Sequence, residues 1–150
     1  MTPKKSQTKA KAASKKKATK KNYIYAVGRR RTSAARIRLF KGKKQSIVNK
    51  LPIDQYFPGA INKSLYEKPY QICDLLGKYY ATIRVVGSGK RSQLDACVHG
   101  IARAIDKVDP DKYHTILKKY KLLTRDARAR ERRKAGQAGR ARHKKQSPKR

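Results

Sequence analysis

Residues 85–92, VVGSGKRS, have the residue types and spacing closest to a nucleotide-binding loop. Such a loop needs G-x-x-x-x-G-K-[ST], because its glycines let backbone N–H groups surround the phosphates while the lysine and hydroxyl meet phosphate and metal. Here Arg84 stands where the first glycine should be, and Arg91 stands where the hydroxyl should be. We therefore expect a turn between a strand and a helix, with no ATP or GTP site.

The cysteines and histidines form no catalytic or metal-binding pattern. Cys73 and Cys97 are the only cysteines and make no C-x-x-C pair, and His99, His114 and His143 are scattered. Buried, reduced thiols in a reducing compartment are the expectation, without a disulfide framework or a zinc site. We predict that the protein is not an enzyme and uses no cofactor or metal.

The charge balance points to a polyanionic partner. The 150 residues include 42 Lys or Arg against 9 Asp or Glu, a formal net charge of +33. Self-repulsion on this scale disfavours the compact free chain, whereas nucleic-acid phosphates would neutralise it and release counterions. The sequence contains neither a run of 18 apolar residues nor the apolar core of a secretory signal, so we expect no membrane insertion and no export.

Charge also divides the chain into three parts. Residues 1–22 contain nine lysines and no acidic residue, and residues 124–150 contain twelve basic residues against Asp126 and Glu131. Nearly all large apolar side chains fall within 23–123, the size of one globular domain. The N-terminal tract is too poor in apolar residues to fold alone, so we expect it to be disordered until bound. It also has features of an organellar transit peptide, which leaves an organellar location open beside the cytoplasm.

Alternating apolar and polar residues predict the strands. The domain opens with YIYAV (23–27), and a basic GRRR interruption separates it from TSAARIRLF (32–40). SIVN (46–49) follows a turn at Gly42 and is predicted to form a hairpin with 32–40. YYATIRVVG (79–87) is the clearest strand and is expected inside the sheet, with Ala81, Ile83 and Val85 on one face.

Apolar residues three and four positions apart predict the helices. The stretch from Leu94 to Val108 fits a core-packing helix with an exposed back, and Ser92 with Asp95 could form its capping box. Asp109 should cap a further helix with Pro110 at its first position. LPIDQYF (51–57) is predicted as a short helical turn, whereas AINKSLYEKPYQICDLL (60–76) is ambiguous because a proline interrupts it.

The last basic segment is predicted to need an RNA surface. Thr124 and Asp126 are expected to open a helical piece, ARARERRKAG (127–136), that has no apolar stripe to pack on a core. A helix of this kind is stable only against another surface.

Several blocks, in order, resemble one family. These blocks are AVGRRRTSAARIRL (26–39), VN (48–49), YFP (56–58), GSGKRSQLDACVHGIARAI (87–105), LLTRDARARERRKAG (122–136) and KKQSPKR (144–150). Together they make residues 23–150 similar to the universal ninth protein of the small ribosomal subunit, in its bacterial or organellar form. The family pattern usually has glycine where Ser88 and Ser92 stand, a small residue where Asp95 stands, and no proline at Pro148.

The resemblance implies a two-layer α/β (α+β) domain. Its mixed four-stranded sheet is packed with helices, in the domain-two-like superfold of ribosomal proteins, which also includes small-molecule kinases. Because that fold hosts both enzymes and RNA binders, the site has to decide between them. The family implies a structural constituent of the small subunit that binds ribosomal RNA in the subunit head beside neighbouring proteins. Its basic C-terminal tail contacts peptidyl-site transfer RNA during translation.

The expected RNA contacts are arginines and lysines, because guanidinium groups bind phosphate oxygens in a bidentate manner. For ribosomal RNA they are Arg29, Arg30, Arg31, Arg36, Arg38, Lys90, Arg91, Arg125, Arg128, Arg130, Arg132, Arg133, Lys144 and Lys145, and for transfer RNA they are Lys149 and Arg150. Tyr23, Tyr25, Tyr79 and Tyr80 could stack on unpaired bases, although packing in the core is favoured for most of them.

Two alternatives stay open at this point. A basic protein that compacts DNA without reading its sequence would fit the charged ends, and a phosphotransferase would fit the glycine loop in part. The core pattern of 23–123 argues against the first, and Arg84 and Arg91 argue against the second.

Overall fold

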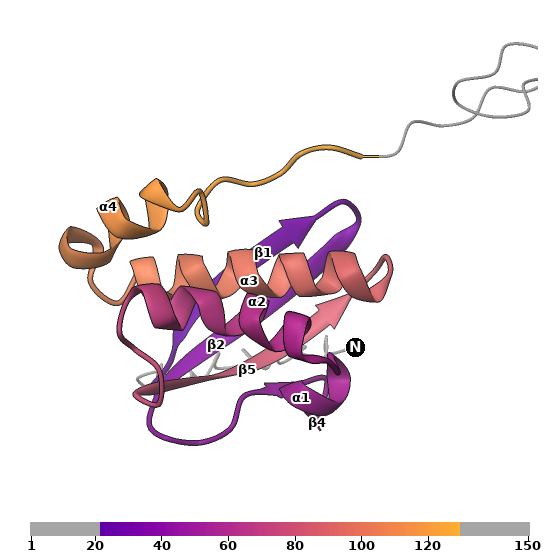
Figure 1. Ribbon diagram of the computed structural model, residues 1–150, viewed down its shortest axis with the longest axis horizontal. Coiled ribbons are helices and arrows are strands. Elements are labelled where there is room, and N and C mark those ends of the chain that lie inside the picture. Colours follow the sequence, from indigo (N-terminus) through magenta and orange to yellow (C-terminus); the bar gives the residue numbers. More distant parts are fainter. Residues whose placement is uncertain (1–21, 130–150) are drawn as a thin grey trace, which may run out of the picture.

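In the computed structural model, which describes residues 22–129, the chain folds into a mixed sheet covered on one face by helices (Figure 1). The strands are β1 (Ile24–Arg30), β2 (Ser33–Lys41), β3 (Ile47–Val48), β4 (Leu51–Pro52) and β5 (Tyr79–Val86). The helices are α1 (Ile53–Tyr56), α2 (Ala60–Ile72), α3 (Lys90–Asp106) and α4 (Pro110–Lys119). α3 and α2 lie on the sheet, and α4 packs against both of them.

The sheet has five strands in the order β1-β2-β5-β3-β4, so the predicted number of four was wrong. All pairs are antiparallel except β3 with β5. β5 lies between β2 and β3, which confirms the prediction that it is an interior strand.

The predicted hairpin between 32–40 and 46–49 was wrong. β2 pairs with β1 and β5, whereas β3 pairs with β4 and β5. The GRRR segment is not an interruption either, because β1 runs through Arg30 and turns at Arg31 and Thr32 into β2. Arg31 has a φ of 51°, the left-handed conformation that this tight turn requires.

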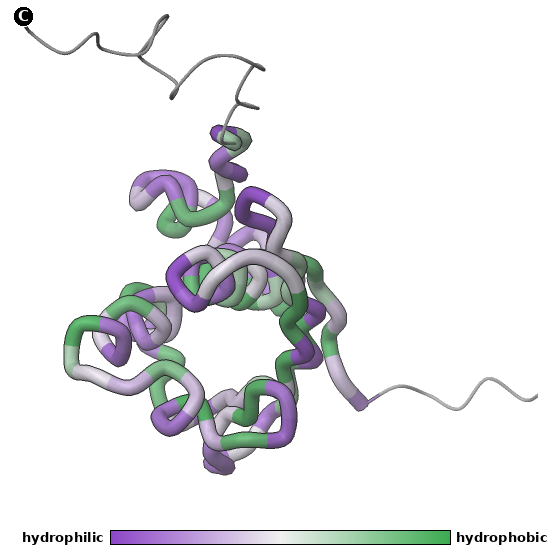
Figure 2. Tube along the Cα trace, turned by 90° about the vertical axis from the view of Figure 1, so that its right-hand side faces the viewer, coloured by the Kyte–Doolittle hydropathy of each residue, from purple (hydrophilic) through white to green (hydrophobic). Residues whose placement is uncertain are grey.

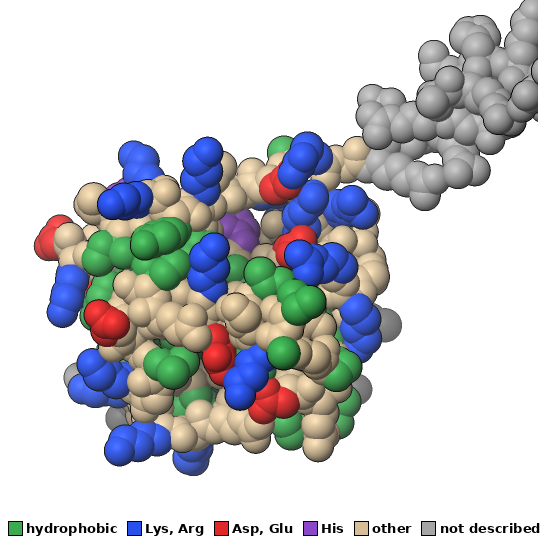
Figure 3. Space-filling model, in the orientation of Figure 1, with side chains coloured by type: hydrophobic (Ala, Val, Ile, Leu, Met, Phe, Trp, Pro, Cys, Tyr) green, Lys and Arg blue, Asp and Glu red, His purple; other side chains and the backbone are tan. Residues whose placement is uncertain are grey.

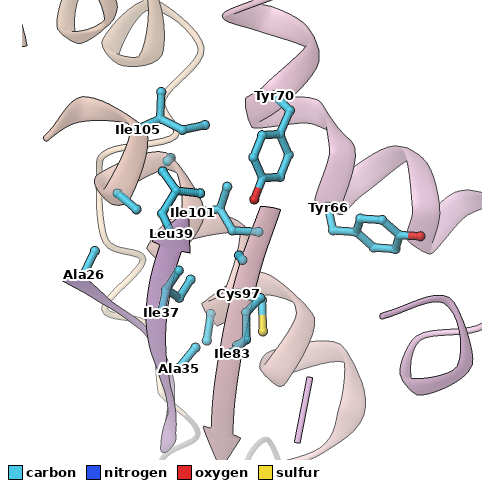
Figure 4. Packing of buried hydrophobic residues seen from close by; sticks show 14 of the residues in the cluster. Ala26, Ala35, Ile37, Leu39, Tyr66, Tyr70, Ile83, Cys97, Ile101 and Ile105 are labelled. Carbon is cyan, nitrogen blue, oxygen red and sulfur yellow. The ribbon is translucent and has the colours of Figure 1, made fainter. Parts of the chain in front are cut away.

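The core lies between the sheet and α3. Alternate residues of β2 and β5 face the helices and are buried. Figure 2 shows hydrophobic and hydrophilic stretches interspersed along the described chain. In Figure 4, Ile37 and Leu39 of β2 point toward Ile101 of α3. Ile37 and Ile101 are fully buried, and each such side chain contributes about 1.5 to 3 kcal/mol of burial free energy. Cys73 and Cys97 are buried free thiols, and burial raises the pKa of both.

The ambiguous stretch 60–76 forms α2 despite Pro69 within it. A proline inside a helix removes one backbone hydrogen bond and costs about 3 kcal/mol. Tyr66, Pro69 and Tyr70 are buried against the rest of the molecule, so tertiary packing outweighs this cost. The short helical turn predicted in 51–57 is α1.

The ends of the helices differ in part from expectation. α3 begins at Lys90 after Gly89, and Ser92 is buried within its first turn, so the predicted capping box does not form. Asp109 does precede Pro110 at the start of α4, but its side chain makes no capping hydrogen bond. Residues 124–129 are extended, so the helix expected to open at Thr124 does not begin there, and the rest of that segment lies outside the described residues.

Candidate nucleic-acid interface

The glycine loop 87–89 joins β5 to α3 and packs against the β1–β2 turn. The Ser33 hydroxyl donates to the Gly87 carbonyl at 3.0 Å. A side chain at Gly87 would collide with the carbonyl oxygen of Thr32. Gly87 has a φ of 85° and Ser88 a φ of 48°, so both adopt the left-handed conformation of a sharp turn. This confirms the predicted turn between a strand and a helix.

This packing gathers basic residues that are far apart in the sequence. We call the end of the molecule that carries Arg29, Arg30, Arg31, Lys90 and Arg91 the basic end. The extended segment after α4 crosses the α3 and β1 side of the molecule toward this same end (Figure 1). The arginines predicted from the GRRR cluster and the cations of the glycine loop are therefore neighbours in space.

A stripe of side chains on α3 closes the free edge of β1. His99, Arg103 and Lys107 lie four residues apart and so share one helix face. The backbone N–H of Arg29 donates to Nδ1 of His99 (3.3 Å). Arg103 and Lys107 donate to the carbonyl oxygens of Val27 (2.7 Å) and Tyr25 (3.0 Å). The back of α3, expected to be exposed, thus satisfies the unpaired groups of an edge strand.

His99 also holds the segment that follows α4. Its Nε2 lies 3.2 Å from the carbonyl oxygen of Leu123, and its Nδ1 accepts from Arg29, so both contacts together require a neutral ring protonated on Nε2. Burial is the largest cause that lowers the pKa of His99, and the charges of Arg103 and Arg125 lower it further, against the Leu123 contact that raises it.

Arg30 is paired within the protein. Its Nη2 lies 3.2 Å from Oδ2 of Asp126, its Nε lies 3.7 Å from Oδ2 of Asp95, and its Nη1 donates to the carbonyl of Arg128 at 2.8 Å. Only 15% of its side chain is exposed. Arg30 therefore fixes where residues 126–128 lie on the body, a role that sequence reasoning missed.

Other cations of the basic end have partners too. The ammonium of Lys90 lies 3.4 Å from the ring centre of Tyr56, and Arg91 lies 3.7 Å from Asp95 on the next turn of α3. Arg128 donates two hydrogen bonds to Oδ2 of Asp126, and the hydrogen bonds from Arg128 hold the pKa of that carboxyl well below its usual range. Lys90 and Arg91 remain close to the solvent at the start of α3.

A second basic surface lies on the face of the sheet that α2 and α3 leave uncovered. Arg36 and Arg38 of β2 and Arg84 of β5 are exposed there. Together with Lys50 they line a hollow of about 840 Å³. Sequence reasoning predicted Arg36 and Arg38 but missed Lys50 and Arg84, and Arg84 has an apolar residue on each side in the sequence.

The tyrosines behave unequally. Tyr25 is 46% exposed beside Arg38 and does not pack in the core. Tyr23 and Tyr80 pack on Phe40 with ring centres 5.6 and 5.2 Å away, half-buried on the uncovered face of the sheet. Tyr79 packs against the core.

Of the remaining predicted site residues, only Arg125 lies within the residues that the structure describes. Arg125 borders a hollow of about 450 Å³ with His99 and Arg103. Outside the described residues lie Arg130, Arg132, Arg133, Lys144, Lys145, Lys149 and Arg150. Within residues 22–129, no three His, Cys, Asp or Glu side chains gather as metal ligands. None of the helices in that range is long and apolar enough to cross a membrane.

The comparisons with known proteins agree with the arrangement of basic residues around a small α/β core. The model of the family described as "Ribosomal protein S9/S16" matches residues 28–150, which is most of the chain. The chain belongs to the ribosomal protein S9/S16 family. It is therefore a ribosomal protein and not an enzyme, which removes the phosphotransferase alternative.

Individual relatives in this family are similar over most of their length. A protein of Maridesulfovibrio salexigens named small ribosomal subunit protein uS9 is 42% identical over 119 residues, covering 79% of this chain and 91% of its own. The protein of that name from Desulfotalea psychrophila is 43% identical over 116 residues, covering 77% and 88%. The one from Rickettsia felis is 42% identical over 114 residues, covering 76% and 70%.

Proposed function

We propose that this ribosomal protein binds ribosomal RNA in the head of the small subunit and extends its C-terminal tail to transfer RNA in the peptidyl site. As a member of the family, it is a structural constituent of the small ribosomal subunit. Other proteins of the subunit head are its neighbours. The bacterial relatives favour a cytoplasmic ribosome over an organellar one.

The observation that carries the RNA proposal is the uncovered face of the sheet with its arginines. The hollow there is lined by Arg36, Arg38, Arg84 and Lys50, and no Asp or Glu contributes to it. Cations without carboxylate partners on a folded surface favour an anionic partner from outside the chain. The net charge of +33 points to a long polyanion, and membership in a ribosomal protein family favours ribosomal RNA as that polyanion.

The tail proposal rests on its start and its composition. Arg30 and His99 hold residues 123–128 on the body, so the last described residues lie beside the basic end. When fully extended, residues 137–150 could span about 45 Å, at roughly 3.3 Å per residue. Lys149 and Arg150 would then meet the phosphates of the transfer RNA without reading its sequence.

Salt dependence tests the RNA proposal. If six or more phosphates are contacted, affinity for small-subunit ribosomal RNA should fall about a thousandfold between about 50 and 200 mM salt. The measurement is the slope of log affinity against log salt for the full chain. A nearly flat plot would refute binding through phosphates. Co-migration with small subunits on a sucrose gradient, instead of pelleting with chromatin, separates this function from DNA compaction.

Deletion of residues 148–150 tests the tail proposal. Subunits that carry the deletion should assemble normally but release peptidyl-site transfer RNA faster, and to a similar degree for different transfer RNAs. A chain with Lys149→Gln and Arg150→Gln keeps the length and should show the same fault if charge is the cause. If both kinds of subunit hold transfer RNA as long as intact ones at equal magnesium, the tail contact is wrong while ribosomal membership stands.

A further inference from the structure

We infer that the uncovered face of the sheet holds a specific seat for an RNA backbone phosphate, built by the cross-strand pair Arg36 and Arg84. This inference rests on the proposed function. Both arginines lie outside the GRRR cluster and the basic tail. The seat differs from the basic end in how its charges are compensated.

The register of the sheet places the two arginines opposite one another. Arg36 of β2 pairs with Arg84 of β5, and both side chains are exposed on the same face. Directly opposed residues have Cβ atoms about 5 Å apart, and like charges in that position destabilise the sheet. In the free protein, this pair therefore opposes folding.

Neighbouring residues reinforce the positive charge without cancelling it. Arg38 lies two residues along β2 with its guanidinium 5.2 Å from the ring centre of Tyr23, and Lys50 lies at the border of the hollow. Across residues 22–129, none of the ion pairs to a carboxylate includes Arg36, Arg38 or Arg84.

The other basic surface shows the contrast. Arg30 and Arg91 of the basic end, and Arg128 beside it, each pair with Asp95 or Asp126. On the helix-covered face, acidic and hydrophobic side chains also lie among the lysines and arginines (Figure 3). A carboxylate compensates each of these three arginines, whereas Arg36 and Arg84 lie directly opposite one another without one. Two opposed, uncompensated guanidinium groups favour an external anion between them.

A phosphodiester group fits the chemistry of the seat. Guanidinium forks donate paired hydrogen bonds to phosphate oxygens, and two forks this close can hold one phosphate from both sides. Bound phosphate would turn the repulsion between Arg36 and Arg84 into a bridge. The seat would thus lower the stability of the free protein and raise its affinity for RNA.

The test compares two effects of the seat, a lower stability of the free protein and a higher affinity for RNA. Arg84→Gln and, separately, Arg36→Gln are made in the full chain, with Lys68→Gln as the control. Lys68 is exposed on α2, on the helix-covered side, so its removal costs one charge without touching the seat. Each variant is measured by urea unfolding at low salt and by titration of small-subunit ribosomal RNA over a series of salt concentrations.

We expect the two seat variants to unfold at higher urea concentration than the unchanged protein. They should bind RNA about fivefold to tenfold more weakly and lose about one unit of salt slope, the effect of one phosphate contact. Lys68→Gln should change affinity by less than about twofold. The double variant should lose little more than either single one, because both arginines serve one phosphate.

Three outcomes would overturn the seat. They are affinity losses no larger than that of Lys68→Gln, a lower urea midpoint in the seat variants, or losses that multiply in the double variant. In each case a steep salt slope in the unchanged protein would keep the RNA-binding function standing. A flat slope in the unchanged protein would instead remove that function, so the two failures are distinguishable.

Discussion

Gly28→Ala should be among the most destabilising changes in the chain, because β1 and α3 meet there backbone to backbone. A Cβ added at Gly28 would lie 2.7 Å from Cα of Gly100 and closer still to the carbonyl oxygen of Ala96. Carbon atoms in contact need about 3.5 Å. α3 would therefore have to move away from β1 by about 0.8 Å or more.

The cost follows from what surrounds the new methyl group. Overpacking a core costs about 1 to 3 kcal/mol when side chains can adjust. Here the colliding atoms belong to the backbone of α3, which cannot rotate away, so we expect about 3 kcal/mol. A displaced α3 would also lengthen the hydrogen bond that His99 accepts from the backbone N–H of Arg29 and the one that Arg103 donates to Val27.

Gly89→Ala is the matched control. Gly89 precedes α3 with φ −91° and ψ 166°, and no atom lies within 4 Å of a Cβ added there. Alanine is a poorer N-cap than glycine by roughly 0.5 to 1 kcal/mol. The stiffer unfolded chain offsets about 0.4 to 1 kcal/mol of this cost, so the net change should stay below about 0.5 kcal/mol.

The assay is urea unfolding of the full chain, followed by far-ultraviolet circular dichroism at fixed salt and pH. We expect the midpoint of Gly28→Ala to fall clearly below those of the unchanged protein and of Gly89→Ala. If Gly28→Ala and Gly89→Ala unfold within about 0.5 kcal/mol of each other, α3 and β1 do not approach as closely as described, and the reasoning fails.

Two further predictions concern the side chains that hold the segment after α4. Because folding lowers the pKa of His99 below its ordinary 6.5, the unfolded chain binds the proton first, so stability should fall as pH drops from about 7 toward 5. His99→Gln should flatten the urea midpoint over that pH range, and an unchanged slope would contradict this role. Arg30→Gln should speed amide hydrogen exchange of Arg128, whose N–H is held by Asp126, and should expose residues 123–128 to trypsin, while Lys68→Gln should do neither. Equal cleavage in both variants would mean that Arg30 does not fix the segment.

The parts of the fold that sequence could predict are those with a strong local period. β5 and α3 were identified because their buried residues repeat every two and every three to four positions. α2 was harder to assign because Pro69 contradicts the helical pattern locally, and only its packing against α3 overrides that. Strand pairing depends on contacts across the whole chain, so β3 was given the wrong partner.

The site was predictable in residue type but not in role. The GRRR cluster was expected to bind RNA throughout, yet Arg30 pairs with Asp126, which lies 96 positions further along the chain. A local sequence pattern cannot indicate a contact between residues so far apart in the chain. Arg84 was not predicted to bind RNA, because a single arginine in an apolar strand does not indicate a binding site. Only the register of the sheet places it opposite Arg36.

Edge protection gives two cations of this protein a role within the fold. β1 is an edge strand, and an exposed edge invites pairing with another chain. α3 closes it by directing Arg103 and Lys107 at carbonyl oxygens of β1, so those charges work as hydrogen-bond donors to the backbone. The net charge of +33 therefore overstates the surface that faces RNA. A substitution series that ranked basic residues by charge alone would mix these structural donors with phosphate contacts. Salt slope and stability, measured together, separate the two groups. Loss of a structural donor should lower the stability of the protein, whereas loss of Arg36 or Arg84 should raise it.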